Sequence, residues 1–538
     1  MTQKVLLGDE AVALAAAHAG LTAAYSYPGT PATEIMEALQ QYAADHGRPV
    51  AAWCANEKTA YEAALGVSFA GKRSFVSMKH VGLNVAADPF LNSTIVSVNG
   101  GLVVAVADDP GMHSSQNEQD TRVYADFART MCLEPANQQE AYDMVREAFD
   151  LSERFHVPIV VRLVTRLAHS RAVVTIGPQR AENPGGKAPD PASWILLPAN
   201  ARRQWRNLLE RQPEMLAWSE ASPYNTLRLV PKRKDLAVIT CGVARNYYIE
   251  NLDDLDEHPS HLHIGAYPLP VDKIRKLVKN VAAVLVLEDG YPVVEARLAG
   301  VLPMGLEVRG KLSGHLPPDG ELGPDIVRQA LGLPARRGIS LEGLTLPIRP
   351  PQLCGGCPHR DAYYALNNVM HEFGGGAVTS DIGCYTLGAL PPYKAIESCV
   401  CMGASIGMAR GAADAGLQPA VAVIGDSTFL HSGMTPLLDA VAADASMTLL
   451  ILDNEATAMT GGQPSLVPSS RLADIVRGLG VPDEHLHVLR AHPSQEKKNE
   501  EVLRQEMAHP GLSVIILVRE CVETLKRKKR TAKTGAPS

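Results

Sequence analysis

The sequence predicts a multidomain α/β protein built on doubly wound parallel sheets. Its 538 residues are too many for a single hydrophobic core. Segments with helical apolar spacing alternate with short apolar runs of the length of buried parallel strands, and two proline-rich stretches interrupt this alternation. An alternation of helices and buried strands is typical of a parallel sheet that carries helices on both faces.

The first predicted domain covers residues 1–175. Its helical periods run over 10–19, 34–44, 57–70 and 139–155, and the apolar runs SFVSM, GGLVVAVA and VPIVVRL lie among them. Residues 176–234 are interpreted as a linker with some helix, because GPQRAENPGGKAPDPASW is dense in glycine and proline.

A smaller α/β domain is predicted over residues 235–335, from LAVITCGVARN through VAAVLVLEDG. A Pro-rich linker follows at 336–352 and contains LTLPIRPPQL. The third predicted domain covers 353–521, with strands at AVAVIGD, MTLLILDN and LSVIILV, and it carries most of the chemical groups. Residues 522–538 are a basic tail, and its KRKKR run is interpreted as a solvated end of the chain.

Composition excludes several classes of protein. Hydrophobic residues make up 46% and charged residues 20%, which is typical of a soluble globular chain. The net charge of -7 comes without a basic face that would suit nucleic acid. No apolar stretch approaches the roughly 18 residues of a membrane helix, and the N-terminus lacks an export signal. We therefore expect a cytoplasmic protein with no membrane span.

Two predicted strand ends carry oxygen ligands. One strand ends at Gly425-Asp426-Ser427, and the next ends at Asn454. Parallel strands open at one carboxyl edge, where such sheets bind ligands. The Asp426 carboxylate, the Asn454 amide oxygen and the backbone carbonyl of Ala456 would supply three ligands to a Mg²⁺ ion that also binds a diphosphate.

The cysteines raise a second question. Of nine in the chain, five fall between Cys354 and Cys401, and the first two form the C-x-x-C pair of LCGGCPHR. Clustering of this kind indicates metal or redox use more than disulfides in a cytoplasmic chain. Zinc usually takes two close pairs, and only Cys399 and Cys401 could form the second pair. A catalytic disulfide would normally follow a strand, whereas this pair follows a Pro-rich stretch.

Several stretches together resemble a known family. They are YPGTPATEI (27–35), NEKTAYEAALG (56–66), MKHVGLNVAADP (78–89), ADDPGMHSSQNEQDTR (107–122), LCGGCPHR (353–360), SDIGCYTLGALPP (380–392), CMGASIGMARG (401–411), GDSTFLHSG (425–433) and TAMTGGQPS (457–465). From residue 4 to about 521 the chain resembles thiamine-diphosphate enzymes, and more closely the alpha subunits of indolepyruvate ferredoxin oxidoreductases. The resemblance implies a pyrimidine-binding domain at 1–175, a diphosphate- and magnesium-binding domain at 353–521, and a transketolase-C-terminal-like domain between them.

The resemblance also implies site residues. Glu57 matches the glutamate that hydrogen-bonds the pyrimidine ring and favours the imino tautomer that removes the thiazolium C2 proton. By position alone, Glu57 could simply complement the dipole of a helix. The loop Tyr27, Pro28, Gly29 and Thr30 matches the site of the substrate carboxylate and carbonyl. The remaining expected cofactor contacts are Gly403, Gly425, Asp426, Ser427, Asn454, Ala456, Thr460, Gly461 and Gly462.

Further groups are candidates for catalysis or specificity. Lys79, His80 and His113 lie in loops after apolar strands, where they could hold an anionic 2-oxoacid. His431 is expected near the cofactor. Met459 replaces the asparagine of pyruvate-specific relatives, and a soft apolar side chain suits an aryl group.

The implied reaction is oxidative decarboxylation of aryl 2-oxoacids to acyl-CoA or aryl acetate and CO₂, with thiamine diphosphate, Mg²⁺ and coenzyme A. Electrons would pass through a [4Fe–4S] cluster on Cys354, Cys357, Cys384 and Cys521 to a partner subunit or ferredoxin, with Cys399 or Cys401 as the alternative fourth ligand. The relatives' ferredoxin-like domain is not expected, because its cysteine-rich runs are missing from this sequence.

The resemblance implies a smaller gamma-type (beta) subunit as partner, in an α2β2 assembly. The alternative function is a non-redox thiamine-diphosphate decarboxylase or carboligase. A third class, a regulatory or binding subunit, is disfavoured because Glu57, Asp426 and Asn454 are all present.

Overall fold

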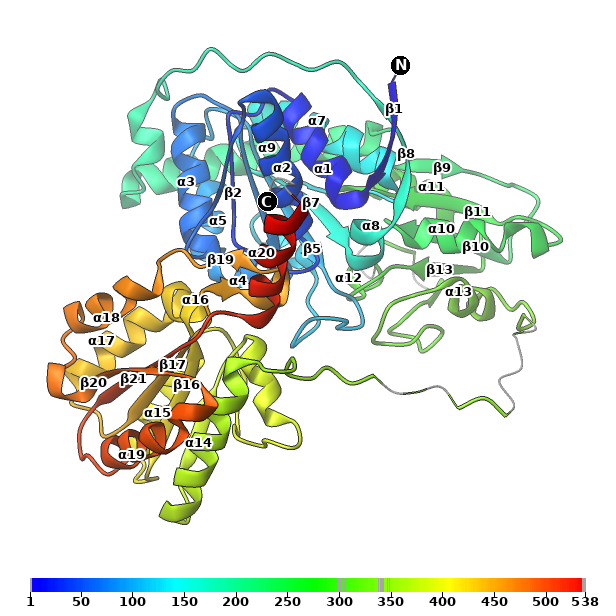
Figure 1. Ribbon diagram of the computed structural model, residues 1–538. Helices are drawn as coiled ribbons and strands as arrows, with labels where there is room; N and C mark the ends of the chain where they lie inside the picture. The colour runs from blue at the N-terminus through cyan, green and yellow to red at the C-terminus, as the bar shows by residue number, and fades with distance from the viewer. Residues whose placement is uncertain are drawn as a thin grey trace. The chain divides into compact units, whose positions relative to one another are not determined.

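The computed structural model describes residues 2–298, 301–303, 305–336, 338, 343–345, 347 and 349–534. The chain divides into two compact units, unit 1 at residues 1–340 and unit 2 at residues 341–538 (Figure 1). The predicted boundaries near 175 and 235 fall inside unit 1. The predicted linker at 336–352 spans the division, and several of its residues lie outside the described part, as do the last four of the predicted tail.

Unit 1 is built around a seven-stranded sheet. In sheet order its strands are β12 (Ala266–Tyr267), β6 (Cys132–Leu133), β7 (Ile159–Val164), β5 (Leu102–Asp108), β4 (Ser74–Lys79), β2 (Ala23–Ser26) and β3 (Val50–Trp53). Every neighbouring pair is parallel except β12 with β6. The runs SFVSM, GGLVVAVA and VPIVVRL lie on β4, β5 and β7, so the prediction of buried parallel strands is confirmed.

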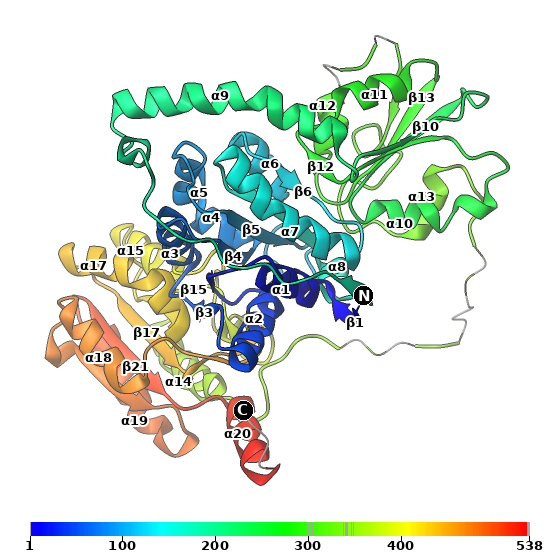
Figure 2. The same ribbon diagram turned by 90° about the horizontal axis from the view of Figure 1, so that it is seen from above.

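Helices cover both faces of this sheet (Figure 2). Successive side chains of β5 point to opposite faces, so Val103 joins one core and Val104 the other. The first core contains α1 (Gly8–His18), α2 (Thr33–His46) and α7 (Gln138–Phe155), and the second contains α3 (Glu57–Phe69) and α5 (Ala87–Ser93). Three shorter helices follow strand ends: α4 (His80–Val85), α6 (Thr121–Phe127) and α8 (Thr165–His169). Strands β1 (Thr2–Leu7) and β8 (Arg171–Ile176) pair as an antiparallel ribbon.

A second sheet of unit 1 has the order β14 (Glu307–Arg309), β13 (Ala283–Leu287), β10 (Leu236–Cys241), β11 (Ser260–Ile264) and β9 (Thr226–Arg228), with only β9 antiparallel. Its helices are α10 (Ala244–Ile249), α11 (Val271–Val278), α12 (Val293–Leu298) and α13 (Pro324–Ala330), and α9 (Pro198–Ala221) precedes it. Both hydrophobic cores of unit 1 contain side chains of both sheets, so the two sheets form one compact body.

Buried charges also join the two sheets of unit 1. Arg162 on β7 pairs with Asp108 on β5 of the same sheet at 2.6 Å between Nε and Oδ2, and its Nη2 donates to the carbonyl of Asp289, which follows β13, at 3.1 Å. Arg122 on α6 pairs with Glu288, which follows β13, at 2.9 Å between Nη1 and Oε2. All four side chains are almost inaccessible to solvent. Buried ions are tolerated only with such partners, and the contacts of Arg122 with Glu288 and of Arg162 with Asp289 join the two sheets.

Unit 2 contains one parallel sheet in the order β15 (Ala377–Ser380), β16 (Ala420–Gly425), β17 (Thr448–Asp453), β21 (Ser513–Val518) and β20 (Leu486–Arg490). One core packs α14 (Pro358–Phe373) and α19 (Glu496–Met507) against the sheet, and the other packs α15 (Ala404–Asp414), α17 (Met434–Ala442) and α18 (Ser469–Gly478). The three predicted strands of this region are β16, β17 and β21, so the doubly wound prediction is confirmed here too.

Short elements at the edge of the unit 2 sheet complete the loops. Helix α16 (Asp426–Thr428) runs into a π-helical turn at Phe429–Gly433, and β18 (Ala456–Thr457) pairs with β19 (Gln463–Pro464). The predicted basic tail forms helix α20 (Val522–Thr534), on which all the cations of KRKKR are exposed. Among the described residues, no helix combines the length and apolarity needed to span a bilayer.

Candidate functional site

Glu57 is placed at the start of α3 by a side-chain cap. The Asn56 Oδ1 atom accepts a hydrogen bond from the Thr59 backbone N–H at 2.9 Å, which fixes the first turn. Glu57 itself is 6% exposed and packs against Gly82 of α4, where a Cβ atom would lie 2.6 Å from the Glu57 Oε1 atom. A glycine at 82 therefore leaves room for the carboxyl group. This burial exceeds what a helix-dipole role needs and fits a carboxyl group that meets a ring nitrogen away from water.

The Tyr27–Thr30 loop follows the carboxyl end of β2. The Gly29 N–H donates to Thr33 Oγ1 at 3.0 Å, and a Cβ atom at Gly29 would lie 3.2 Å from the Cβ atom of Lys79. Ser114 Oγ donates to the Thr30 carbonyl at 3.4 Å. Tyr27 and Pro28 are buried, while Gly29 and Thr30 are half-buried. The fold thus brings this loop beside Lys79.

The three cationic candidates of unit 1 have different environments. Lys79 is 8% exposed and its Nζ donates to the Ser114 carbonyl at 2.7 Å. Burial lowers the pKa of Lys79 to about 8, against a smaller opposing effect of Asp109. His80 is also buried, with Nε2 3.2 Å from the Asn117 carbonyl, and no described residue hydrogen-bonds its Nδ1. The His113 ring is 54% exposed and lies 3.5 Å from Glu321.

In unit 2, Asp426 and Asn454 lie at one edge of the sheet. They follow β16 and β17, which are parallel neighbours, so both residues emerge at the carboxyl edge. Thr457 Oγ1 donates to Ser427 Oγ at 3.0 Å and joins the two loops. Asn454 Oδ1 accepts the Ala456 N–H at 3.1 Å, which orients the amide. The predicted ligand loops are therefore held side by side.

The Asp426 carboxylate is suited to a cation. It is 4% exposed, and its Oδ2 atom has no hydrogen-bond partner in the described part of the chain. Burial, and secondly the charge of Asp453, raise the pKa of Asp426 to about 7. A bound Mg²⁺ would offset both effects, because a hard cation favours an oxygen-rich set of carboxylate, amide and carbonyl. The residues present fit the ion.

The glycines at this edge have packing roles of their own. A Cβ atom at Gly425 would lie 2.6 Å from the Tyr385 ring, and one at Gly403, where φ is +86°, would lie 2.6 Å from the Ser432 carbonyl. Both glycines are therefore explained by close packing, whether or not a cofactor approaches them. His431 is buried nearby, with Nδ1 2.6 Å from Ser432 Oγ.

The Thr460–Gly462 segment is held by helix α20. Arg527 donates to the Gly461 carbonyl at 2.7 Å and to the Gly462 carbonyl at 2.8 Å. Thr460 Oγ1 donates to Gln463 Oε1 at 2.7 Å. Met459, the candidate specificity residue, is 58% exposed. The interpretation of KRKKR as a solvated run did not anticipate that Arg527 hydrogen-bonds this segment.

Four cysteines line one cavity of unit 2, with a volume of about 430 Å³. They are Cys354, Cys357, Cys384 and Cys521. Burial, followed by smaller effects that include the other thiols, raises the pKa of Cys357 to about 11 and that of Cys384 to about 12. Such thiols stay protonated unless a metal group stabilises the thiolates.

Two observations bear on what these thiols hold. The alternative ligands, Cys399 and Cys401, are exposed and do not line the cavity, and Cys399 Sγ instead contacts the Asp381 carbonyl at 3.8 Å. Sulfur atoms around one tetrahedral zinc ion are roughly 3.8 Å apart. In the described part of the chain, no three of the four cavity thiols have all their sulfur atoms within 4.8 Å of one another. The wider spacing suits a multi-iron cluster better than one zinc ion.

His359 is a residue whose role the sequence did not indicate. It lines the same cavity, and its Nε2 accepts a hydrogen bond from Asn454 Nδ2 at 3.3 Å. Burial lowers the pKa of His359 to about 4, so the neutral ring can accept this bond. The Cys521 N–H also donates to the Asn454 carbonyl at 3.0 Å. In the sequence, His359 could have been noticed only because it follows Cys357 by two residues at the start of a helix.

Asp381 was also missed. It directly follows β15, so it emerges at the same edge as Asp426. Its carboxylate accepts from Ser405 Oγ at 2.6 Å and from the Tyr385 hydroxyl. Burial raises the pKa of Asp381 to about 6. The strand-end argument used for Asp426 could have identified it.

Comparison with known proteins identifies the family. Residues 14–195 match the family described as pyruvate flavodoxin/ferredoxin oxidoreductase, thiamine diP-binding, and residues 381–517 match the thiamine pyrophosphate enzyme C-terminal TPP-binding domain. The chain is 39% identical to the indolepyruvate oxidoreductase subunit IorA of Archaeoglobus fulgidus, over 98% of this chain and 87% of that protein. Identity to IorA of Pyrococcus abyssi is 33%, over 96% and 85%. This chain belongs to the IorA family.

Two further matches extend the comparison. Ketoisovalerate oxidoreductase subunit VorA of Pyrococcus furiosus is 31% identical over 33% of this chain and 45% of that protein. A structure of 2-oxoglutarate:ferredoxin oxidoreductase from Magnetococcus marinus shares the fold, with a TM-score of 0.50, 16% identity and coverage of 61% of this chain and 65% of that one. The predicted family, the oxidoreductase class and the thiamine-diphosphate-binding domains are confirmed.

Proposed function

We propose that this IorA-family chain catalyses the oxidative decarboxylation of aryl 2-oxoacids of the indolepyruvate and phenylpyruvate type. The products would be CO₂ and an acyl-CoA or aryl acetate, and the electrons would pass through a [4Fe–4S] cluster to a partner subunit or ferredoxin. One observation carries the redox part of the proposal. Asn454 belongs to the magnesium loop and is also hydrogen-bonded to His359 and Cys521 of the cysteine cavity.

Candidate groups for the cofactor are present in each unit taken by itself. When bound, thiamine diphosphate supplies the carbon nucleophile and the electron sink that decarboxylation of a 2-oxoacid needs. Glu57 of unit 1 presents its carboxyl group to the pyrimidine. In unit 2, Asp426, Asn454 and the Ala456 carbonyl hold the Mg²⁺ ion of the diphosphate. The closed packing of Glu57 and Asp426 keeps water from both carboxyl groups.

The substrate carboxylate is assigned to Lys79 and the adjacent Gly29–Thr30 backbone. Lys79 is buried, and its Nζ donates to the Ser114 carbonyl. An ammonium group has three N–H donors, so Lys79 can also donate to an incoming carboxylate. His80 is assigned as the second donor in its doubly protonated form, because Nε2 faces the Asn117 carbonyl and leaves Nδ1 for the substrate. His113 is half-exposed and lies 3.5 Å from Glu321, so we assign it a smaller contribution to binding of the substrate carboxylate.

The cluster ligands are assigned to Cys354, Cys357, Cys384 and Cys521. Cys354 is exposed, so electrons can leave the cavity on this side toward an acceptor. The relatives are named as subunits, IorA, VorA and VorB, which indicates multi-subunit enzymes. We propose a smaller gamma-type subunit as the partner, in an α2β2 assembly, with coenzyme A as the acyl acceptor.

The test is an assay of the reconstituted enzyme. The chain is purified without oxygen together with the smaller subunit, and CO₂ release and dye reduction are measured with and without coenzyme A. Indolepyruvate and phenylpyruvate are expected to react with coupled dye reduction, while pyruvate and branched-chain 2-oxoacids react poorly. Reaction of only the latter would refute the aryl specificity. CO₂ release without dye reduction would instead identify a non-redox decarboxylase.

Lys79 makes the substrate affinity depend on pH. Its ammonium group is charged below a pKa of about 8 and neutral above it. We therefore expect KM for the 2-oxoacid to rise about tenfold per pH unit above this value. In K79Q, KM at pH 7 is expected to be about 10–100-fold higher, because a charged hydrogen bond is lost, and to change little between pH 7 and 9.

The matched control for Lys79 is K58Q. Lys58 is exposed on α3 and pairs with the exposed Glu62, so its removal should leave both KM and its pH profile unchanged. Steady-state kinetics from pH 6.5 to 9.5 provide the measurement. If K79Q kept the rise of KM above pH 8, a group other than Lys79 would hold the carboxylate.

A further inference from the structure

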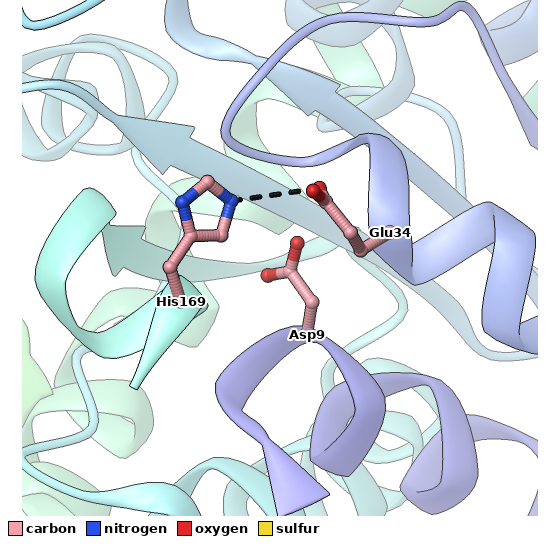
Figure 3. A group of neighbouring side chains, drawn as sticks. All are labelled: Asp9, Glu34 and His169. Carbon is pink, nitrogen blue, oxygen red and sulfur yellow. Dashed lines mark ion pairs between the residues drawn. The ribbon is translucent and has the colours of Figure 1, made fainter. Parts of the chain in front are cut away.

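Three side chains of unit 1 that have no role in the proposed reaction converge on one point. Asp9 lies in the first turn of α1, Glu34 in the first turn of α2, and His169 at the end of α8 (Figure 3). One potential ligand atom from each of them lies within 4.8 Å of the others. Among the described residues this is the only such group of three.

Asp9 supplies the observation that points to a ligand. Its side chain is completely buried, and neither carboxylate oxygen has a hydrogen-bond partner among the residues that the structure describes. In Figure 3 its carboxylate is directed toward Glu34 and His169. A buried carboxylate without donors is costly, so it requires either a proton or a cation.

The second observation is the distance between the other two members. Glu34 Oε2 and His169 Nε2 are 3.5 Å apart. A charge-assisted hydrogen bond between these groups would be about 2.7–2.9 Å long. Two ligand atoms on one tetrahedral ion, each about 2.0–2.1 Å from it, are roughly 3.4 Å apart. The spacing is that of two ligands of one ion.

We propose that Asp9, Glu34 and His169 form a binding site for a divalent metal ion of the zinc type. Two carboxylate oxygens and one imidazole nitrogen are a mixed donor set that Zn²⁺ accepts, whereas Mg²⁺ and Ca²⁺ favour oxygen alone. The Glu34 and His169 side chains are 37% and 35% exposed, so the remaining coordination position faces water.

The site has a structural consequence for the substrate loop. The ion would join the start of α1, the start of α2 and the end of α8. Helix α2 begins directly after the Tyr27–Ala32 segment, so the ion would fix the end of that segment. The inference does not depend on the proposed reaction, because it rests on the geometry of unit 1 alone.

The competing state is a protonated Asp9 with no ion, and D9N separates the two. Asparagine has the shape of the protonated acid but replaces a carboxylate ligand with a neutral amide. Full-length protein with its cysteine cavity loaded with cluster is freed of loose metal by a chelator and titrated with Zn²⁺ by calorimetry. One equivalent per chain is expected to bind, and D9N is expected to bind at least about 100-fold more weakly.

The matched control is E37Q. Glu37 is exposed one turn further along α2, so its change should leave zinc binding intact. H169A removes an exposed ligand without touching the core, and it should weaken binding as D9N does. This second variant keeps the test decisive if D9N folds poorly.

Cobalt distinguishes this site from the cysteines. Co²⁺ bound by oxygen and nitrogen lacks the intense sulfur-to-metal charge-transfer absorption that thiolate ligands produce. The difference spectrum of the wild type with and without Co²⁺ is expected to show only the weak ligand-field bands, and D9N loses them. No zinc binding to the wild type, undiminished binding to D9N and H169A, or a thiolate spectrum would each overturn the proposal.

Discussion

Replacing Glu57 with glutamine is expected to slow exchange of the thiazolium C2 proton of bound thiamine diphosphate by about 10²–10⁴-fold. Glutamine keeps the size of the side chain and can still hydrogen-bond the pyrimidine, but its amide cannot exchange a proton with the ring as a carboxyl group can. Binding of the cofactor should therefore change little. The exchange is measured by NMR in deuterated buffer on the cofactor-loaded protein, so no partner subunit or acceptor is needed.

Two variants show whether the loss belongs to the Glu57 carboxyl group. E62Q changes an exposed glutamate on the same helix, which pairs with Lys58, and it should exchange at the wild-type rate. G82A introduces a methyl group into the space 2.6 Å from the Glu57 carboxylate and should slow exchange by displacing it. An unchanged rate in E57Q would return Glu57 to the role of a helix-terminal acid.

The central strands were predictable because their residues are buried on both faces. Strands β5, β16 and β17 are entirely buried and consist mainly of apolar residues. The same reasoning identified Asp426 and Asn454, since each directly follows such a strand. The sharing of hydrophobic cores between the two sheets of unit 1 left no comparable signal, because the apolar periods show that a face is buried and not what it packs against.

Contacts between distant residues were beyond sequence patterns. Asn454 meets His359 only because α14 packs on the sheet near the end of β17, and spacing in the sequence does not encode that. The group of Asp9, Glu34 and His169 is spread over three helices in the same way. Cys521, the proposed fourth cluster ligand, was assigned by resemblance alone, since its neighbours in the sequence do not indicate a metal.

Among the variants of the cysteine cavity, C521A is expected to cause the largest loss of iron and of dye reduction. The cavity would keep three thiols, and iron content should fall from about four atoms per chain to background, together with the visible absorption of the cluster. The main-chain bond from residue 521 to the Asn454 carbonyl does not need the sulfur atom, so the magnesium loop should stay in place. Binding of Mg²⁺ and thiamine diphosphate should therefore persist in C521A while dye reduction is lost.

C521A is informative because it should remove the cluster without removing the binding of Mg²⁺ and thiamine diphosphate. C401A removes an exposed thiol that does not line the cavity, and its iron content should match the wild type. If C521A kept its iron and C399A or C401A lost it, the fourth ligand would be one of those two cysteines. That result would require the 397–403 segment to move, because Cys399 now contacts the Asp381 carbonyl outside the cavity lining. Cys354, Cys357, Cys384 and Cys521 instead already line one cavity. Cys521 reaches it because it follows β21, and β21 is the sheet neighbour of β17.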